Sequence, residues 1–294
     1  MIKLSVVILS YNTKDITKDC LEKLYKSLSN ASFQSEIIII DNASVDGSQE
    51  MISQSKKIFA KRNVTFKTIF NQQNEGYPKG NNRGFHNATG EYILFLNSDV
   101  MIDTFHWDKV LKYLDEQTNI GALTVRVELP TKRIDPASHR GFPTIWNSFC
   151  YYAYLEAMTK HIHFLRRYFG GYHLTNLNLN TVHEIDSPSG AFYLTRKKIL
   201  NGLGGFDETF FMYGEDLDLS YRMKENGYKI VYYPHENVTH FKYQSGLKNT
   251  VAQKKTKQYF YDSMRIFYRK HYEGENPWLI DQVVYFFIGL KSQL

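Results

Sequence analysis

Three short apolar runs in the first hundred residues limit what this chain can fold into. The runs Lys3–Leu9, Ser35–Ile40 and Tyr92–Leu96 consist mainly of consecutive apolar residues, which is typical of strands buried on both faces of a parallel sheet. Segments with apolar residues at helical spacing, Thr13–Leu28 and Ser48–Ala60, lie between the runs. This alternation predicts an α/β fold with a Rossmann-like, mostly parallel central sheet flanked by helices.

A cluster of polar side chains follows each apolar run directly. A further strand at Val64–Phe70 and a short helix at Gly80–Asn87 fit between the second and third runs. Because the carboxyl ends of parallel strands meet at one edge of a sheet, the three clusters are expected to lie together at that edge, where ligands bind. The clusters are Ser10-Tyr11-Asn12, Asp41-Asn42-Ala43-Ser44 and Asn97-Ser98-Asp99.

The second half of the chain has a less regular pattern, and residues 130–180, rich in aromatic residues with Pro and Gly, indicate no clear element. The expected organisation is a catalytic domain over 1–250, divided into a nucleotide-binding half (1–100) and an acceptor half (101–250), with a helical extension over 251–294. Helices are predicted at Trp107–Gln117, Lys197–Leu203, Glu215–Asn226 and Ala252–Tyr272, and strands at Ile120–Val127, Ala191–Leu194 and Tyr228–Tyr233.

Composition excludes several classes of protein. The net charge of +6 is spread along the chain without a dense basic stripe, so no nucleic-acid partner is expected. Two cysteines are too few for a disulfide framework and indicate a reducing compartment. No signal peptide and no run of 18 apolar residues is present, so the expected location is the cytoplasm, with contact at the inner face of the plasma membrane as a further reading.

Acidic residues at two places have the chemistry for transfer of a group from a diphosphate. Asp99 follows a buried strand, where a carboxylate can hold Mg²⁺ or Mn²⁺ against a departing diphosphate. Glu215, Asp216 and Asp218 open a helix, and one of them could deprotonate an acceptor hydroxyl. Simple helix capping is the alternative interpretation of both places, and a lone His240 would ordinarily be structural.

In order along the chain, seven segments resemble the inverting family 2 glycosyltransferases, which have the GT-A fold. The resemblance covers roughly residues 3 to 245, and its NSD and GEDLDLSYR segments are most similar to rhamnosyltransferases and galactofuranosyl-transferring relatives that build bacterial surface polysaccharides. The segments are VVILSYN at 6–12, IIIIDNASVDGS at 37–48, NEGYPKGNNRGF at 74–85, LFLNSDV at 94–100, SPSGAFYLTRKKIL at 187–200, GGFDETFFMYGEDLDLSYR at 204–222 and VTHF at 238–241.

The resemblance implies a role for each matching residue. Asp99 and His240 would hold Mn²⁺ or Mg²⁺, Asp216 would be the catalytic base, and Glu215 beside it would contact donor or acceptor. Asn97 stands where the family usually has the first acidic residue of its DXD motif, which implies weaker metal binding. Asp218 and Arg222, four residues apart, are expected to form a structural pair. The donor-binding residues would be Ser10, Tyr11, Asn12, Asp41, Asn42, Ser44, Asn74, Gly76, Gly80, Asn81, Asn97, Ser98, Ser189 and Gly190.

The implied reaction moves a sugar from a nucleoside diphosphate to a hydroxyl of a saccharide or lipid-linked saccharide, with inversion. The preferred donor is dTDP-L-rhamnose; a UDP-hexose or UDP-galactofuranose is the alternative, because Asp41 would meet the same imino edge on uracil and thymine. Two other classes stay open: a sugar-nucleotide-binding subunit without turnover, and a nucleotidyltransferase, although SYNTKD lacks the expected glycine-rich, arginine-containing phosphate loop.

The tail over Trp278–Leu290 mixes aromatic and aliphatic residues and is too short to span a bilayer. It could lie at a membrane interface, together with the aromatic stretch 145–154 and the basic segment His161–Arg167. Contact with the catalytic domain or with a second subunit in a homodimer is the alternative interpretation.

Overall fold

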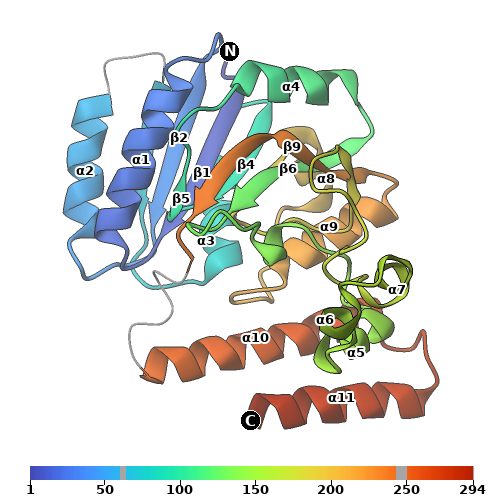
Figure 1. Ribbon diagram of the computed structural model, residues 1–294. Helices are drawn as coiled ribbons and strands as arrows, with labels where there is room; N and C mark the ends of the chain where they lie inside the picture. Colours follow the sequence, from blue (N-terminus) through green and yellow to red (C-terminus); the bar gives the residue numbers. More distant parts are fainter. Residues whose placement is uncertain (60–63, 243–249, 294) are drawn as a thin grey trace.

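The computed structural model describes residues 1–59, 64–242 and 250–293, and in these ranges the chain forms a nine-stranded mixed sheet. Strands β1 to β4 are parallel, whereas β8 joins β4 to β6 by antiparallel pairing. The order is β3-β2-β1-β4-β8-β6-β9-β5, with β7 also paired to β9 (Figure 1). The strands are β1 Leu4–Ser10, β2 Ser35–Asp41, β3 Val64–Phe70, β4 Tyr92–Asn97, β5 Val100–Met101, β6 Ile120–Glu128, β7 His183–Ile185, β8 Phe192–Arg196 and β9 Lys229–His240.

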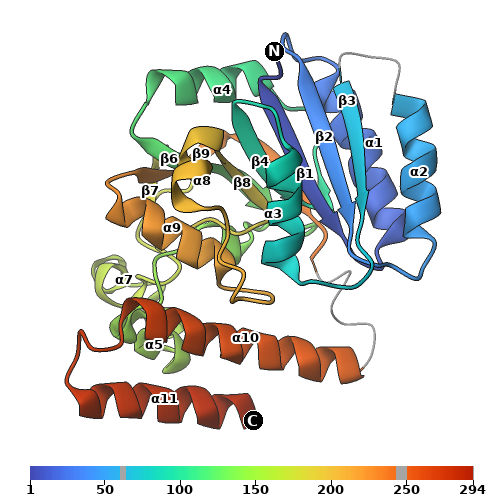
Figure 2. The same ribbon diagram turned by 180° about the vertical axis from the view of Figure 1, so that it is seen from behind.

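Helices cover both faces of the sheet (Figures 1 and 2). One apolar core joins the sheet to α1, α2 and α4, and a second joins its other face to α3, α8 and α9. Helices α10 and α11 run side by side at one end of the molecule. The helices are α1 Lys14–Leu28, α2 Ser48–Phe59, α3 Tyr77–Asn87, α4 Trp107–Glu116, α5 Ile145–Tyr152, α6 Leu155–Thr159, α7 His163–Phe169, α8 Lys197–Leu203, α9 Glu215–Glu225, α10 Thr250–His271 and α11 Trp278–Gln293.

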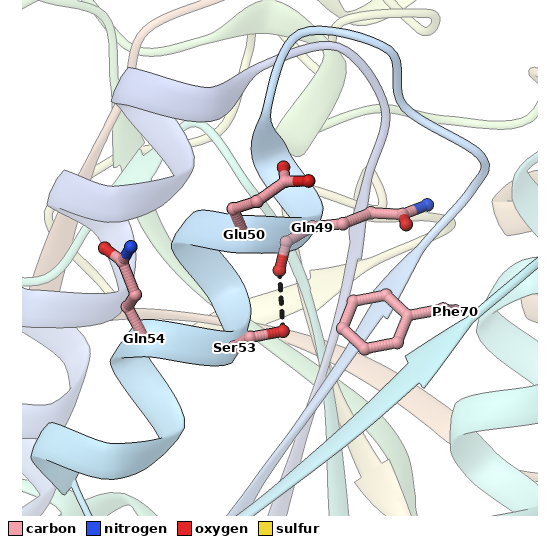
Figure 3. Close-up of a pocket in the computed structure, with 5 residues that line it drawn as sticks. All are labelled: Gln49, Glu50, Ser53, Gln54 and Phe70. Carbon is pink, nitrogen blue, oxygen red and sulfur yellow. Dashed lines mark hydrogen bonds between the residues drawn. The ribbon is translucent and has the colours of Figure 1, made fainter.

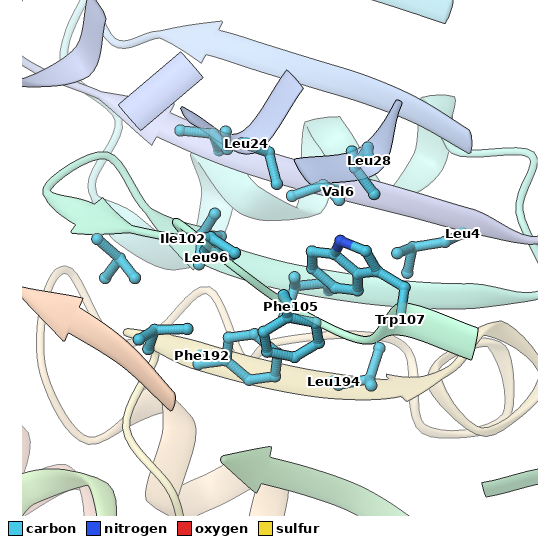
Figure 4. Packing of buried hydrophobic residues seen from close by; sticks show 14 of the residues in the cluster. Leu4, Val6, Leu24, Leu28, Leu96, Ile102, Phe105, Trp107, Phe192 and Leu194 are labelled. Atoms are coloured by element: carbon cyan, nitrogen blue, oxygen red, sulfur yellow. The ribbon is translucent and has the colours of Figure 1, made fainter. Parts of the chain in front are cut away.

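Alternate residues of each inner strand enter opposite cores, which explains the uninterrupted apolar runs. Around Trp107, the first core packs the rings of Phe105 and Phe192 against aliphatic residues of β1, β4 and α1 (Figure 4). The indole Nε1 of Trp107 donates to Ser27 Oγ at 3.0 Å, so this fully buried ring leaves no polar atom unpaired. Truncation of such a side chain typically costs about 3–5 kcal/mol, so this core holds the sheet edge rigid.

The predicted strand ends are confirmed. Ser10 of β1 lies opposite Asp41 of β2, and Leu9 lies opposite Asn97 of β4, so the three polar clusters meet at one edge of the sheet. The four helices predicted in the second half and tail all exist, with ends shifted by at most two residues. The predicted end of the second helix, Ala60, lies outside the described residues.

Several boundaries in the sequence interpretation were wrong. Helix α3 begins at Tyr77 rather than at residue 80, because Pro78 in its first turn is compatible with a helix start. Strand β9 continues past Tyr233 to His240, because it pairs with β6 and then with β5, a two-residue strand that local pattern did not indicate. Residues 130–180 contain α5, α6 and α7, three short helices with few buried residues.

The nine-stranded sheet takes strands from both predicted halves of the catalytic domain. The division at residue 100 and the boundary at residue 250 therefore stay predictions, and the second lies beside 243–249, outside the described residues. Within the described ranges, no helix combines the length and the apolar character needed to cross a bilayer.

Candidate active site

The end of β4 and the end of β9 bring Asp99 and His240 together. Antiparallel pairing places Val100 opposite His240, and the amide of Phe241 donates to the carbonyl of Asp99 at 2.8 Å. His240 Nε2 consequently lies 3.2 Å from Asp99 Oδ1. The two residues assigned to the metal from the sequence are thus neighbours, although 141 positions separate their numbers (240 minus 99).

A third residue, Asp135, fixes the imidazole of His240. Its buried carboxylate lies 2.8 Å from His240 Nδ1 through Oδ2 and accepts from Lys242 Nζ at 2.8 Å through Oδ1. Burial lowers the pKa of His240, but the hydrogen bonds to Asp135 and Asp99 outweigh it and raise the pKa to about 9. Burial acts in the opposite direction on Asp135, whose pKa nevertheless falls because of His240 and Lys242.

These residues fit a divalent cation. Asp99 offers an oxygen, His240 offers a nitrogen, and a carboxylate behind the imidazole is the usual support for a metal-bound histidine. Over the described residues, no group of three or more His, Cys, Asp or Glu side chains is placed to hold a metal alone. A cation here would therefore depend on substrate phosphates for further ligands, as Mg²⁺ and Mn²⁺ commonly do.

Tyr77 connects the strand end that precedes Asp99 to the loop that contacts Asp216. Its hydroxyl donates to Asn97 Oδ1 at 3.0 Å and also lies 3.1 Å from the carbonyl oxygen of Gly190. Burial raises the pKa of Tyr77, and the charges of Glu215, Asp216 and Asp99 raise it further, so the ring stays a neutral donor. A Cβ on Gly190 would lie 2.4 Å from the tyrosine oxygen, which explains the glycine.

Asp216, at the start of α9, lies in a buried ion pair. Its Oδ2 is 2.6 Å from Arg140 Nη2 and accepts from the amide of Gly190 at 3.2 Å, and its Oδ1 accepts from the amide of Leu217 at 2.8 Å. Arg140 also reaches the carbonyl of Pro188 at 3.3 Å. The guanidinium supplies the positive charge that a buried carboxylate needs, and it fixes the direction in which the carboxylate points.

Glu215, next to Asp216 in the sequence, has no such positively charged partner among the described residues. The side chain is buried, and its Oε2 finds no hydrogen-bond partner among the residues that the structure describes. Burial and the adjacent charge of Asp216 raise the pKa of Glu215 well above its usual range, so this carboxyl holds a proton at neutral pH. The neighbours thus differ in chemistry: a charge-paired carboxylate beside a protonated acid.

The predicted nucleotide-binding residues lie at the ends of β1 and β2. Asp41 Oδ1 accepts from the Ser44 amide at 3.0 Å and from Gln49 Nε2 at 2.9 Å. Its Oδ2 is buried and has no hydrogen-bond partner within the described part of the chain. Ser44 Oγ also accepts from the amide of Asn12 at 2.9 Å, which joins the loops after the two strands. Asp41 therefore presents an unused acceptor.

Asn42 organises the loop before α3. Its Nδ2 donates to Asn74 Oδ1 at 2.8 Å and to the carbonyl of Gly76 at 3.3 Å, and its Oδ1 accepts from Asn71 Nδ2 at 3.0 Å. Gly76 has φ +85°, and a Cβ there would meet the Phe211 carbonyl oxygen at 2.5 Å. These contacts are structural.

The remaining residues predicted to bind the donor fall into three groups, according to their surroundings. Ser10 and Ser98 both hydrogen-bond Thr13 Oγ1, at 3.2 and 3.3 Å, while the ring of Tyr11 is 37% exposed at the same edge. Ser189 Oγ is buried, with no partner in the described ranges. Gly80 and Asn81 lie within α3: a Cβ on Gly80 would collide with Leu9, and Asn81 Nδ2 donates to the Tyr77 carbonyl, so both have local structural roles.

A shallow hollow of about 380 Å³ adjoins the nucleotide-side residues. It is lined by Gln49, Glu50, Ser53 and Gln54 of α2 and by Phe70 at the end of β3 (Figure 3). Gln49 is the residue that bonds Asp41, so the hollow lies behind the nucleotide edge rather than between Asp99 and Asp216. Its lining includes none of Asp99, Glu215 and Asp216.

Sequence reasoning missed Tyr77, Asp135 and Arg140. Tyr77 lies inside the segment NEGYPKGNN, so the resemblance could have singled it out. Asp135 and Arg140 lie in the irregular stretch after β6, and their partners are distant in sequence, so no local pattern marks them. The predicted pair of Asp218 and Arg222 is confirmed, with Arg222 Nε 2.8 Å from Asp218 Oδ2.

Comparison with known proteins finds similar bacterial glycosyltransferases. Putative glycosyltransferase EpsH of Bacillus subtilis (strain 168) is 32% identical over 117 residues, covering 40% of this chain and 31% of that protein. Rhamnosyltransferase WbbL of Escherichia coli (strain K12) is 24% identical over 157 residues, covering 52% of this chain and 53% of that protein. The chain therefore matches about half or less of these relatives' lengths.

Solved structures share the fold at low sequence identity. S. aureus TarS superposes with a TM-score of 0.58 and 18% identity, covering 94% of this chain and 41% of that one. Mannosyltransferase PcManGT from Pyrobaculum calidifontis, in complex with GDP-Man and Mn²⁺, has a TM-score of 0.55 and 15% identity, covering 90% and 64%. The fold is accordingly the GT-A fold.

Family models match nearly the whole chain. The model for "Glycosyl transferase family group 2" matches residues 150–287. The model for "Glycosyl transferase family 2" matches residues 5–198, more than half of the 294 positions. Together with the arrangement of Asp99, His240 and Asp216 at the edge of the sheet, this match shows that the chain belongs to glycosyl transferase family 2.

Proposed function

We propose that this protein transfers a sugar from a nucleoside diphosphate to a hydroxyl of a cell-surface saccharide, in one displacement with inversion. The observation that carries the proposal is the contact of His240 with Asp99, supported by Asp135, at the same edge of the sheet as Asp216. The likeness to solved structures with UDP and with GDP-Man and Mn²⁺ supports a nucleotide-sugar donor and a divalent metal.

At the donor end, the unused Asp41 Oδ2 would accept the imino hydrogen of a pyrimidine base, beside the exposed ring of Tyr11. Asp99 and His240 would hold Mn²⁺ or Mg²⁺. Such a cation, when bound, would neutralise the negative charge of the leaving diphosphate. Tyr77 holds the carbonyl of Gly190 and the amide of Asn97 in fixed positions between these residues and α9.

Asp216 would take the proton from the acceptor hydroxyl as that oxygen bonds to the anomeric carbon. The bond from this carbon to the phosphate oxygen breaks at the same time, and its electron pair leaves with the diphosphate. Arg140 and the Gly190 amide both contact Asp216 Oδ2, which leaves Oδ1, bonded to the Leu217 amide, as the oxygen with capacity for the proton. Glu215 would donate a hydrogen bond to donor or acceptor.

The Asp216→Asn variant tests the assignment of the base. We expect turnover to fall by about 10²–10⁴, the range for loss of a general base, while binding of the donor survives. Initial rates of transfer and calorimetric titration with the donor measure the two quantities separately. Equal loss of donor binding would contradict the role, and a melting curve shows whether the unpaired Arg140 has destabilised the fold.

The donor itself is proposed as dTDP-L-rhamnose, on the similarity to a rhamnosyltransferase. UDP-linked hexoses are the second candidate, favoured by the likeness to a structure with UDP-GlcNAc. Donor hydrolysis should be measured with dTDP-rhamnose, UDP-glucose, UDP-GlcNAc, UDP-galactofuranose and GDP-mannose, each with Mn²⁺, Mg²⁺ and a chelator. Hydrolysis of none of them under any metal condition would favour a subunit that binds sugar nucleotides without turnover.

A further inference from the structure

Helix α11 is oriented with its apolar side outward. Its buried residues are Asp281 and Ile288, and Asp281 Oδ1 accepts from Tyr268 Oη of α10 at 2.6 Å. The acid of this helix therefore faces the protein, which is the reverse of the usual arrangement on a surface helix. The exposed large side chains are Trp278, Leu279, Ile280, Val283, Phe286, Phe287 and Leu290, between 39% and 72% accessible.

Helices α5 to α7 present a second group of exposed apolar side chains at the same end of the molecule. Both views show α5 beside α10 and α11 (Figures 1 and 2). Tyr152 of α5 packs its ring 5.5 Å from Lys291 Nζ of α11, and its hydroxyl meets Met264 Sδ of α10 at 3.6 Å. The exposed side chains here are Trp146, Phe149, Tyr151, Tyr154, Met158, Ile162, Phe164 and Tyr168, between 44% and 72% accessible. We call these two groups together the apolar end.

The charges of the apolar end are predominantly basic. Between residues 141 and 183 the sequence has Glu156 as its single acid, and this carboxylate is 12% exposed and paired with His173. Lys160 and Arg167 are exposed in the same stretch. The exposed positions of α11 carry no charge among those described, and the nearest acids, Glu273 and Glu275, lie in the turn before the helix. This distribution is complementary to an anionic surface.

We propose that the apolar end rests on the headgroup region of an anionic lipid bilayer, with α11 lying in the plane of the interface. Tryptophan and tyrosine with aliphatic side chains and flanking cations are the composition of interfacial helices, and α11 is too short to span. A two-fold dimer through this face would enclose Lys160 and Arg167 of both copies in one largely apolar interface, where their charges would lose water. The proposal does not depend on the identity of the donor or of the catalytic base.

The proposal also bears on how the acceptor reaches the site. Arg140 pairs with Asp216, and the chain enters the apolar end directly after it: the amide of Phe142 donates to Asp186 Oδ2 at 3.0 Å, and α5 begins at Ile145. The segment that leads to α5 therefore starts at Arg140, the residue paired with Asp216. A bilayer that contacts α5 to α7 would lie at the other end of this short segment. An acceptor carried on a lipid could be presented there.

Vesicle flotation with the full chain tests the proposal. We expect the wild type to float with phosphatidylcholine vesicles that contain a quarter phosphatidylglycerol, and to float much less with phosphatidylcholine alone. Phe286→Ser with Phe287→Ser should abolish flotation, whereas Phe286→Leu with Phe287→Leu should largely keep it. Because each surface cation adds about a factor of five to partitioning, Lys160→Gln with Arg167→Gln should weaken it by an order of magnitude or more.

Lys112→Gln is the charge control: this exposed lysine belongs to α4, the helix at the opposite end of the molecule from α11 (Figure 1), so the substitution should not change flotation. Donor hydrolysis in solution, unchanged in both Phe286/Phe287 variants, shows that they fold. The proposal is overturned if the wild type floats with neither vesicle, or if the serine variant floats as the wild type does. It is also overturned if light scattering shows a dimer that the serine variant dissociates while neither protein floats.

Discussion

At the scale of single residues, Glu215 and Asp216 are adjacent in sequence, yet the fold gives their side chains different surroundings. Asp216 faces Arg140 at 2.6 Å, whereas Glu215 is buried, has a raised pKa, and has one oxygen with no hydrogen-bond partner among the described residues. A protonated carboxyl donates a hydrogen bond, which an amide can imitate and an alanine cannot. These surroundings support the proposal that Asp216 acts as the base and Glu215 as a neutral hydrogen-bond donor.

Glu215 is predicted to act in its protonated form. Glu215→Gln should keep transfer within about tenfold of wild type, while Glu215→Ala should lose about 10–100-fold, the value of one buried hydrogen bond to substrate. The wild type should lose activity as alkaline pH removes the Glu215 proton, and the Gln variant should not show that decline. Rates of both variants measured from neutral to alkaline pH decide the point; a Gln variant as inactive as Asp216→Asn would contradict it.

Asp135 is predicted to act through His240 rather than on substrate. Its Oδ2 lies 2.8 Å from the imidazole Nδ1, and removal of such a supporting carboxylate typically weakens metal binding. Asp135→Asn should raise the Mn²⁺ concentration for half-maximal donor hydrolysis by about 10–100-fold. The same substitution in a His240→Ala background should change this concentration no further. An additional, independent shift in the double variant would show that Asp135 acts by another route.

At the scale of elements, buried apolar runs and parallel pairing made it possible to predict that the three polar clusters meet at one edge of the sheet. Ser10, Asp41 and Asn97 end neighbouring strands, and the sheet rule that joins them needs no knowledge of side chains. Arg140 and Asp135 could not be found in this way, because they lie in an irregular stretch and meet partners that only the finished fold brings near. His240 was found through the family resemblance, and the long strand β9 that carries it was cut short in the sequence interpretation.

Helix α10 is anchored to α9 through Asp218. This fully buried carboxylate meets Arg222 Nε and His271 Nε2 at 2.8 Å and Lys270 Nζ at 2.7 Å. Burial raises the pKa of Asp218, but the hydrogen bond from His271 and the positive charges of Arg222 and Lys270 outweigh burial and lower the pKa to about 2. A lowered pKa means that the stabilisation is complete above the unfolded value and is lost as pH falls toward the folded value.

Asp218→Asn should therefore destabilise the fold by an amount that depends on pH. The difference in unfolding free energy between wild type and variant should shrink by on the order of 2 kcal/mol as pH falls from 5 toward 2. Urea unfolding at a series of pH values measures this difference, with Asp103→Asn, an exposed aspartate near the end of β4, as the control. A difference that stayed constant across this window would show that the ion pairs of Asp218 do not hold α10.

At the scale of the whole molecule, the two tail helices contribute differently. Phe267 of α10 is 3% exposed and packs with Phe210 and Leu217, beside the loop and helix that carry Asp216. Ser263 Oγ of the same helix donates to the Met212 carbonyl at 2.9 Å. Helix α11 places Asp281 and Ile288 against the protein and leaves most of its side chains exposed. The tail is thus one helix that packs against the catalytic domain and one helix whose exposed apolar face we propose rests on a bilayer.

Two truncations should separate these contributions. A chain ending at residue 242 loses the burial of Phe267 and the partners of Asp218, so its unfolding free energy should fall by about 2–5 kcal/mol and Asp216 should lose its fixed position. A chain ending at residue 276 lacks only α11 and should keep nearly all of its stability and its hydrolysis of the donor in solution. Urea unfolding and hydrolysis with Mn²⁺ measure both chains side by side. Equal damage from the two truncations would mean that α11 is needed for the stability of the rest of the chain, whereas the few buried residues of this helix predict a small effect.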